Sequence, residues 1–517
     1  MSKTRGGRRA KYAALEAAAR TSANAAIQQL AWQPLRYTDA PVTPLDEEGV
    51  QAIHTTAMRI LEEIGIDFLH EEARAHLKAA GCLVDGVTVR MDRAFVMAQI
   101  AKAPAGFTIT PRNPAHAITV DGTQALFGTV GSPPNVSDLK RGRRIGNHHD
   151  YQNLLRLAQS FNCIHFISGY PVEPVDLHAS VRHLDAIQDK LLLTDKVVHA
   201  YCLGEARVED AMQMVRIAAG LTQEQFDAQP RMFSNINSSS PLKHDWPMLD
   251  GAMRLARHGQ PMIVAPFTLA GAMAPITLAG AVAQQTAEGL AAIALLQWIA
   301  PGAPVIYGSF TSNVDMRSGA PAFGTPEYMR ATQMSGQMAR FYNLPLRASN
   351  ANAANHPDSQ AMWESCNSLY GALSAHTSRV YHAAGWLEGG LCANFEKFVM
   401  DCELIQQWIH YHQPVQVNAD DLAFEAIRQV GPHGHFLGCD HTQMHYESAF
   451  YRPFLSDWQN FERWEEAGAK RVEQRAGEMV DALLDAYQPP PIDPAVREAL
   501  ADFVARRKAE GGAPTDF

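Results

Sequence analysis

Eight short runs of strand-forming residues recur along the chain, and most are followed by a stretch with helical spacing. Each run ends in small or polar residues, as strands do where they lead into loops. Strand alternating with helix predicts a parallel sheet of the α/β class, and eight such units predict a closed (β/α)8 TIM barrel. The runs are Ala125–Thr129, Ile164–Ser168, Lys196–Cys202, Arg231–Asn235, Met262–Pro266, Pro304–Tyr307, Pro345–Ser349 and Arg379–His382.

The chain is longer than a barrel requires, with 517 residues against the roughly 250 of a bare TIM barrel. We divide it into a basic, mobile N-terminal arm (1–33), an N-terminal α+β cap (34–122), the barrel (123–410) and a C-terminal helical extension (411–517). Within the last part, Asp457–Tyr487 has the composition of one charged helix. The extensions at both ends favour a homo-oligomer.

Composition excludes several classes of partner. The net charge of −10 argues against nucleic acid, because phosphate binding requires a basic face. No run of 18 apolar residues appears, so no membrane span is expected. The seven cysteines are odd in number and contain no C-x-x-C pair, which is typical of a reduced cytoplasmic protein.

The expected loops lack the familiar catalytic signatures. There is no GxGxxG after a strand, no P-loop, no HExxH and no GxSxG, which argues against nucleotide cofactors, zinc proteases and serine hydrolases. Barrel enzymes carry their chemistry on the loops after the strands. Aromatic, amide and ionisable residues occur there: Tyr170, Phe267, Tyr307, Phe310, Asn350, Asn352, His382, Trp386 and Glu388. Aromatic faces with a carboxylate suit a methylated ammonium, which is held by ring quadrupoles and has no N–H to donate.

Two further features have alternative interpretations. Arg347 lies inside the seventh predicted strand, where a buried guanidinium needs an anionic partner. It either binds a substrate carboxylate or pairs with a structural acid. The stretch His433–His445, with Cys439, contains residue types that bind Zn²⁺. Its spacing fits no standard finger and it follows the last strand, so we favour loop packing and expect no metal site.

Several stretches, in their order and spacing, resemble the trimethylamine methyltransferase family from about Pro34 to Arg507. They are Ile53–Gly65, Phe127–Thr129, Ser240–Leu242, Gly271–Gly280, Tyr307–Asn313, Gly319–Glu327, Pro357–Ala361, Leu387–Glu388 and Trp464–Lys470. The resemblance implies a barrel that transfers a methyl group from a methylated amine to the cobalt of a separate, cognate corrinoid protein. It also implies that the barrel itself holds no tightly bound cofactor.

The same resemblance bears on the substrate. In archaeal trimethylamine enzymes pyrrolysine precedes a P-D-x-Q-A stretch, and counting back from Pro357 places that position at about Ala351, between Asn350 and Asn352. Without pyrrolysine, the chain resembles members that act on quaternary amines such as glycine betaine. We expect Glu388, Asn350, Ala351 and Asn352 to form the catalytic region. Rings of Tyr170, Phe267, Tyr307, Phe310 and Trp386 would hold the cation, and Arg347, His356 or His382 a carboxylate.

Two other functions fit the same residues. One is a zinc-dependent methyltransferase for a thiol or an alcohol, with His and Cys ligands. The other is a catalytically idle barrel that binds a betaine as a sensor or carrier.

Overall fold

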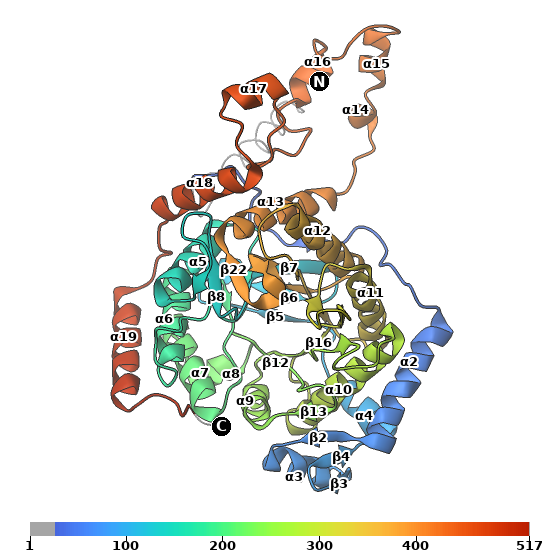
Figure 1. Ribbon diagram of the computed structural model, residues 1–517, viewed down its shortest axis with the longest axis vertical. Helices are drawn as coiled ribbons and strands as arrows, with labels where there is room; N and C mark the ends of the chain where they lie inside the picture. The colour runs from blue at the N-terminus through green and yellow to red at the C-terminus, as the bar shows by residue number, and fades with distance from the viewer. Residues whose placement is uncertain (1–25, 516–517) are drawn as a thin grey trace.

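The computed structural model describes residues 26–515, and its centre is a curled sheet of eight parallel strands (Figure 1). The strands follow one another in the order β11-β10-β7-β20-β19-β16-β14-β12. Their bounds are β7 Gln124–Thr129, β10 Phe166–Ile167, β11 Val197–Val198, β12 Ser234–Ile236, β14 Met262–Val264, β16 Val305–Gly308, β19 Leu346–Ser349 and β20 Arg379–Ala384. All eight overlap the predicted runs. The predicted N-terminal arm lies, up to residue 25, outside the described residues.

The two edges of this sheet meet. A parallel bridge joins His199, just after β11, to Phe233, just before β12. The Ala200 N–H also donates to the Phe233 carbonyl oxygen at 3.1 Å. Eight parallel strands joined in this way, each followed by a helix, have the arrangement of a TIM-like barrel.

The helices that follow the strands cover the outside of the sheet. They are α5 His148–Ser160, α6 Arg182–Leu193, α7 Glu205–Ala219, α9 Trp246–Arg257, α10 Leu278–Ile299, α11 Pro326–Phe341, α12 Ser359–Ser374 and α13 Phe395–Tyr411. Helix α10 is buried on nearly all sides because α2 (Glu47–Arg59) and α4 (Arg93–Ile100) pack over its outer face. A helix covered on both faces is apolar all round, as its Ala- and Leu-rich sequence is.

Elements at both ends of the chain pack against the barrel. Before β7, the strands β2 (Ile66–Phe68), β3 (Leu83–Asp85) and β4 (Thr88–Arg90) form a small sheet with β13 (Lys243–His244). After α13, the helix α18 (Val472–Asp485) packs on α13 and α5. The last helix, α19 (Pro494–Ala509), packs on α6 and α7. The predicted domain boundaries stay predictions.

The single helix predicted over Asp457–Tyr487 is wrong. The structure contains α17 (Phe461–Glu466) and α18, separated by Gly468 and Ala469, both with a positive φ (97° and 50°). A left-handed backbone stops an α-helix, and glycine adopts it at little cost. Between α13 and α17 three short helices, α14 (Ala419–Leu422), α15 (Phe424–Val430) and α16 (Asp440–His445), were not predicted.

Side chains fill one end of the barrel interior and leave the other end open. Leu126, Phe166, Phe233, Ile263 and Ile306 form a buried apolar cluster inside the sheet. They lie toward the start or middle of their strands, so the carboxyl ends of the strands surround the remaining space. No helix within residues 26–515 is long and apolar enough to cross a membrane.

Candidate active site

A cavity of about 520 Å³ opens at the carboxyl ends of the barrel strands. Each of the eight strands, or the loop directly after it, contributes to its lining. This is where TIM-barrel enzymes place their active sites, and the volume suits a small organic molecule. We therefore take this cavity as the candidate active site.

Arg347 is a buried cation in the wall of the cavity and is only 3% exposed. Its Nη1 donates to the Ser309 carbonyl oxygen at 3.1 Å, and its Nε has no hydrogen-bond partner in residues 26–515. The guanidinium carbon lies 4.9 Å from the centre of the Phe310 ring and 4.6 Å from that of Tyr381. Among the described residues no carboxylate forms an ion pair with Arg347; burial lowers its pKa, and the nearby acids that oppose this are Tyr381 and Tyr328. A buried guanidinium without an anion is costly, which favours an anionic ligand over a structural salt bridge.

His382 adds a second hydrogen-bond donor beside this cation. The Gly131 N–H donates to its Nδ1 at 3.2 Å, so in the neutral ring the proton is on Nε2. Burial, and then the charge of Arg347, hold the pKa of His382 well below its ordinary value, so the ring is neutral. Nε2 lies 3.4 Å from Arg347 Nη2, and both atoms carry hydrogen. Two donors cannot bond to each other, but both can donate to the oxygens of one carboxylate.

Aromatic rings line the space next to these donors. Phe310 lies 4.9 Å from Phe267 and 6.2 Å from Trp386 between ring centres, and Trp386 lies 4.1 Å from His382. The Trp386 Nε1–H donates to the Asn352 carbonyl oxygen at 3.1 Å, which fixes the orientation of the indole. Gly390 (φ 103°) passes so close to this ring that a Cβ there would lie 2.6 Å from it. The faces of such rings attract a quaternary ammonium.

The side of the cavity formed by the loop after β12 is polar, and a buried carboxylate holds that loop in place. Ser238 lines the cavity, and its hydroxyl donates to Glu288 of α10. The same carboxylate accepts from the Ser240 hydroxyl at 2.6 Å and the Leu242 N–H at 2.8 Å. Glu288 thereby holds the loop after β12 in place.

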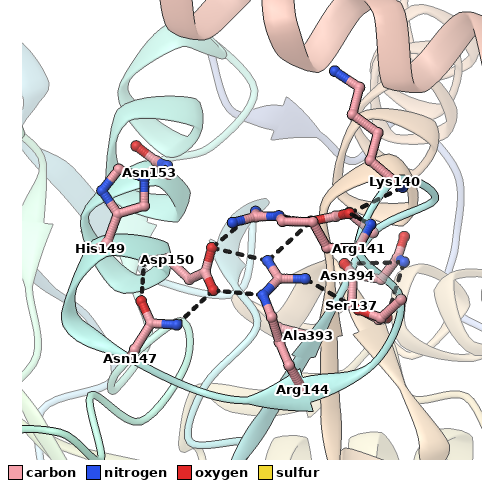
Figure 2. Close-up of polar contacts among 12 residues, drawn as sticks. Ser137, Lys140, Arg141, Arg144, Asn147, His149, Asp150, Asn153, Ala393 and Asn394 are labelled. Carbon is pink, nitrogen blue, oxygen red and sulfur yellow. Dashed lines mark hydrogen bonds and ion pairs between the residues drawn. The ribbon is translucent and has the colours of Figure 1, made fainter.

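A small sheet at the rim supports the loop that carries Trp386 and Gly390. Strand β22 (Cys392–Asn394) continues from this loop and pairs with β8 (Asn135–Ser137), which pairs in turn with β9 (Arg144–Ile145). Figure 2 shows Arg141 and Arg144 converging on Asp150, at the start of α5. Arg144 donates to both carboxylate oxygens at 2.9 Å, and Arg141 donates to one at 3.1 Å. Burial alone would raise the pKa of Asp150, but the bonds and charges of these arginines outweigh it and lower the pKa.

Five of the predicted site residues line the cavity together. They are Phe267, Phe310, Arg347, His382 and Trp386. They come from strands or loops far apart in sequence and meet only because the sheet curls. Their roles toward a ligand stay predictions.

The predicted catalytic stretch Asn350–Asn352 lies behind the cavity wall. All three residues are fully buried, and none lines the cavity. Asn350 Nδ2 donates to the Ala383 carbonyl oxygen at 3.0 Å, and Asn352 Nδ2 donates to the Ala361 carbonyl oxygen at 3.2 Å. Asn352 thus reaches the cavity only through its carbonyl bond to Trp386.

A buried ion pair anchors the same region from behind. Lys397 and Asp401 pair within α13 with side chains that are 0% exposed. Asp401 also accepts from the Gly385 N–H at 2.9 Å and from the Ser365 hydroxyl at 2.8 Å. The pair therefore holds α13 against α12 and against the loop that follows β20.

Four other predicted residues also lie away from the cavity lining. Tyr307 points outward from β16, and its hydroxyl shares a hydrogen bond with Thr286 of α10 at 2.7 Å. Tyr170 packs behind Tyr201, with ring centres 4.6 Å apart. Residue 356, a histidine, is exposed on the surface. Glu388 lies at the rim, where Arg143 Nε donates to it at 2.9 Å.

Two tyrosines of the cavity were not singled out from the sequence. Tyr201 and Tyr381 both line it, and burial raises the pKa of Tyr381 to about 12 and raises the pKa of Tyr201 well above its ordinary value. Both lie inside or at the end of predicted strands. Alternation along the strand, which places every second side chain inside the barrel, was the available signal for Tyr381.

The histidine-rich stretch does not gather into a metal site within the part of the chain that the structure describes. The rings of His441 and His445 lie 4.5 Å apart between centres and are tilted by 43° relative to each other. In residues 26–515 there is no group of three or more His, Cys, Asp or Glu side chains arranged to hold a metal ion. All seven cysteines are free thiols.

Comparison with known proteins places this barrel in a family. The family model described as trimethylamine methyltransferase (MTTB) matches residues 5–512. The chain belongs to this family. The match covers the barrel, the elements on both sides of it and every residue that lines the cavity.

Relatives within the trimethylamine methyltransferase family differ in their substrates by name. The chain is 37% identical to the glycine betaine methyltransferase of Desulfitobacterium hafniense strain Y51, over 90% of this chain and 98% of the relative. It is 29% identical to the trimethylamine methyltransferase MttB of another strain of that species, over 90% and 94% of the two chains. It is 28% identical to the proline betaine:corrinoid methyltransferase of Eubacterium limosum, over 78% and 84%.

Proposed function

We propose that this chain transfers a methyl group from a betaine, a quaternary amine that carries a carboxylate, to the cobalt of a corrinoid held by a separate protein. Glycine betaine is the favoured substrate. The observation that carries the proposal is the pair of donors on Arg347 and His382, which lies directly beside the aromatic wall of Phe310 and Trp386. A betaine has an anionic end and a methylated cationic end a few bonds apart, which matches this arrangement.

In this proposal Arg347 and His382 bind the carboxylate. The charge of the guanidinium strengthens its hydrogen bond to a carboxylate, because the group is only 3% exposed. Fixing this end of the substrate directs the trimethylammonium group toward the rings. One methyl group then points to the cavity mouth, where the acceptor arrives.

The reaction requires little acid or base catalysis. The carbon–nitrogen bond breaks with its electron pair going to nitrogen, and the methyl carbon forms a bond to the attacking Co(I). The product amine is neutral and leaves without a proton. This agrees with a neutral His382 and with a cavity lining that, among residues 26–515, contains no carboxylate. The residues act by positioning and electrostatics.

The rim of the cavity suits a protein that carries the acceptor. Large apolar side chains on loops after five strands are exposed there: Ile145, Val175, Ile276, Met316 and Leu391. An exposed apolar ring around an active-site mouth is typical of a docking surface. A corrinoid is too large to enter a cavity of about 520 Å³ with the substrate, so its carrier would cover the mouth.

The test is methyl transfer in vitro. The purified chain is mixed with a corrinoid protein or cobalamin reduced to Co(I), and the loss of the Co(I) absorbance is followed with glycine betaine, proline betaine, trimethylamine and tetramethylammonium. We expect transfer from a betaine and none from trimethylamine. Transfer from trimethylamine alone would contradict the proposed substrate class. Tight betaine binding without transfer to any corrinoid acceptor would support the idle, betaine-binding barrel instead.

A further inference from the structure

Residues 412–450, here called the arm, leave the barrel at the end of α13 and return at Tyr451 (Figure 1). Figure 1 shows α14, α15 and α16 standing away from the barrel. The return is anchored on α13, where Glu403 accepts from the Tyr451 hydroxyl at 3.1 Å and the Phe454 N–H at 3.0 Å. Within the arm, His441 Nε2 lies 3.1 Å from the Asp420 carbonyl oxygen. The arm is thus a folded segment whose two ends are held at α13.

The arm exposes far more apolar surface than its own packing covers. Ten large apolar side chains along it are exposed, whereas Ala426 and Cys439 are the buried ones. The six most exposed, at 61% to 88%, are Val415, Val417, Leu422, Phe424, Leu437 and Phe450. At roughly 100 Å² for each side chain, the arm presents on the order of 1,000 Å² of apolar surface. Short helices with such faces are stabilised by packing against a partner.

A groove that suits this surface lies beside the base of the arm. It has a volume of about 480 Å³ and lies between α12, α13 and residues 39–42. Tyr370 and Tyr411 line it and are exposed, and Cys366 is an exposed thiol within it. Trp408 Nε1 and His412 Nδ1 are buried there and have no hydrogen-bond partner within the part of the chain that the structure describes. The groove therefore offers aromatic surface together with two unsatisfied polar atoms.

We propose that a second copy of this chain is the occupant, with each arm lying in the groove between α12 and α13 of the other copy. Tyr411 and His412 belong both to the groove and to the base of the arm. A two-fold axis beside them therefore places each arm across the partner's groove, and the two contacts are identical, as in most dimers. Two arms would bury on the order of 2,000 Å² of apolar surface, which reaches the range of permanent homodimers.

The position of the groove distinguishes this partner from the carrier of the methyl acceptor. Helices of a TIM-like barrel run opposite to its strands, so the carboxyl end of α13 lies at the amino ends of the strands. The cavity opens at the other end of the barrel. A protein that delivers an acceptor to the cavity therefore approaches a different face of the barrel from the one that holds the groove. The proposed dimer is independent of the proposed reaction.

Sedimentation of charged variants tests the proposal. We expect the native chain to sediment as two copies at about 10 μM. The arm variant Phe424→Glu/Leu437→Glu and the groove variant Tyr370→Glu should each sediment as one copy, with dissociation constants raised at least about 100-fold. The matched control is Leu83→Glu, which charges an equally exposed side chain on β3 and should leave the dimer intact. Betaine binding should stay within about two-fold for all variants, because none contacts the cavity.

Mixing the two monomeric variants tests the pairing itself. The arm variant keeps a native groove and the groove variant keeps a native arm, so the mixture should form a heterodimer with one intact contact. A single Phe424→Cys substitution should also form a disulfide across two copies with the native Cys366 under mild oxidation. A monomeric native chain, a dimer that survives the arm substitutions, or a mixture that does not associate would each overturn the proposal. Protection of arm amides only after a corrinoid protein is added would overturn it in favour of that partner.

Discussion

Replacing Arg347 by methionine tests the central claim about the cavity. The guanidinium is 3% exposed and its donors face a space beside His382, so in the proposed complex it makes charge-assisted hydrogen bonds out of contact with water. Losing one partner of such a buried pair costs about 2–5 kcal/mol. At about 3 kcal/mol, the dissociation constant of glycine betaine should rise about 100-fold. Titration calorimetry measures this directly.

A ligand without a carboxylate should respond in the opposite direction. Tetramethylammonium has only the cationic end, and the buried charge of Arg347 repels it. In Arg347→Met its affinity should stay the same or rise. The preference for betaine over tetramethylammonium should therefore disappear, which a general loss of structure would not produce. Arg347→Lys keeps the charge but not the paired donors, so its betaine affinity should fall between that of the native chain and that of Arg347→Met.

The control is Arg143→Met, which removes an equally charged but half-exposed side chain at the rim. Its effect on betaine affinity should be less than about three-fold, because solvent screens it. The thermal midpoint of Arg347→Met should not fall, since the substitution removes a buried charge that no carboxylate compensates. A betaine affinity within about three-fold of the native value in Arg347→Met would refute the assignment of the carboxylate site.

Four further variants test other parts of the structure. Trp386→Leu should weaken betaine binding about 5- to 30-fold through the loss of about 1–2 kcal/mol of cation–π attraction. Tyr307→Phe should leave betaine binding unchanged, because the native Tyr307 hydroxyl contacts α10 and not the cavity. Equal effects of the two substitutions would argue against the assignment of the rings to the cation. Asp150→Asn should lower the free energy of unfolding by about 1–3 kcal/mol at pH 7 in urea titrations, because two arginines lose their shared anion. Its native pKa is lowered, so this contribution is present above about pH 4 and lost as the pH falls below that, and the variant should match the native chain in acid. Burial lowers the pKa of His165 to about 3, so the unfolded chain binds one more proton than the native chain between about pH 6.5 and 3. His165→Gln should therefore reduce the loss of unfolding free energy in acid by about 1.4 kcal/mol for each pH unit in that window. An unchanged slope of unfolding free energy against pH would contradict the buried neutral state.

Regular periodicity made the barrel predictable. Each predicted strand combines β-branched or aromatic residues with a boundary of small or polar ones, and helical spacing follows. Those signals are local, so eight units could be counted without knowing how they pack. Helix ends were less predictable. The break at Gly468 and Ala469 depends on backbone angles that the charged composition of the segment does not reveal.

The candidate site was predictable only in part. Loops after strands directed attention to Phe310, His382 and Trp386, which do line the cavity. For the other predicted residues, the direction of the side chain decided whether they line the cavity. Tyr307 lies at the end of its strand like a site residue, yet its parity on the strand directs it outward to α10. Asn350 and Asn352 follow β19 but satisfy their amides with backbone carbonyls behind the wall.

The sequence by itself determined the alternation of strand and helix, the family and the residue types available at the strand ends. It could not determine whether Arg347 has a structural acid as its partner, because that depends on which side chains of distant strands meet inside the curled sheet. Only the tertiary structure placed Arg347 beside His382 and between two rings, with no carboxylate among the described residues paired to it. It also separated the arm from the barrel and left its apolar side chains exposed. Both outcomes depend on contacts between segments far apart in the chain, which local patterns do not specify.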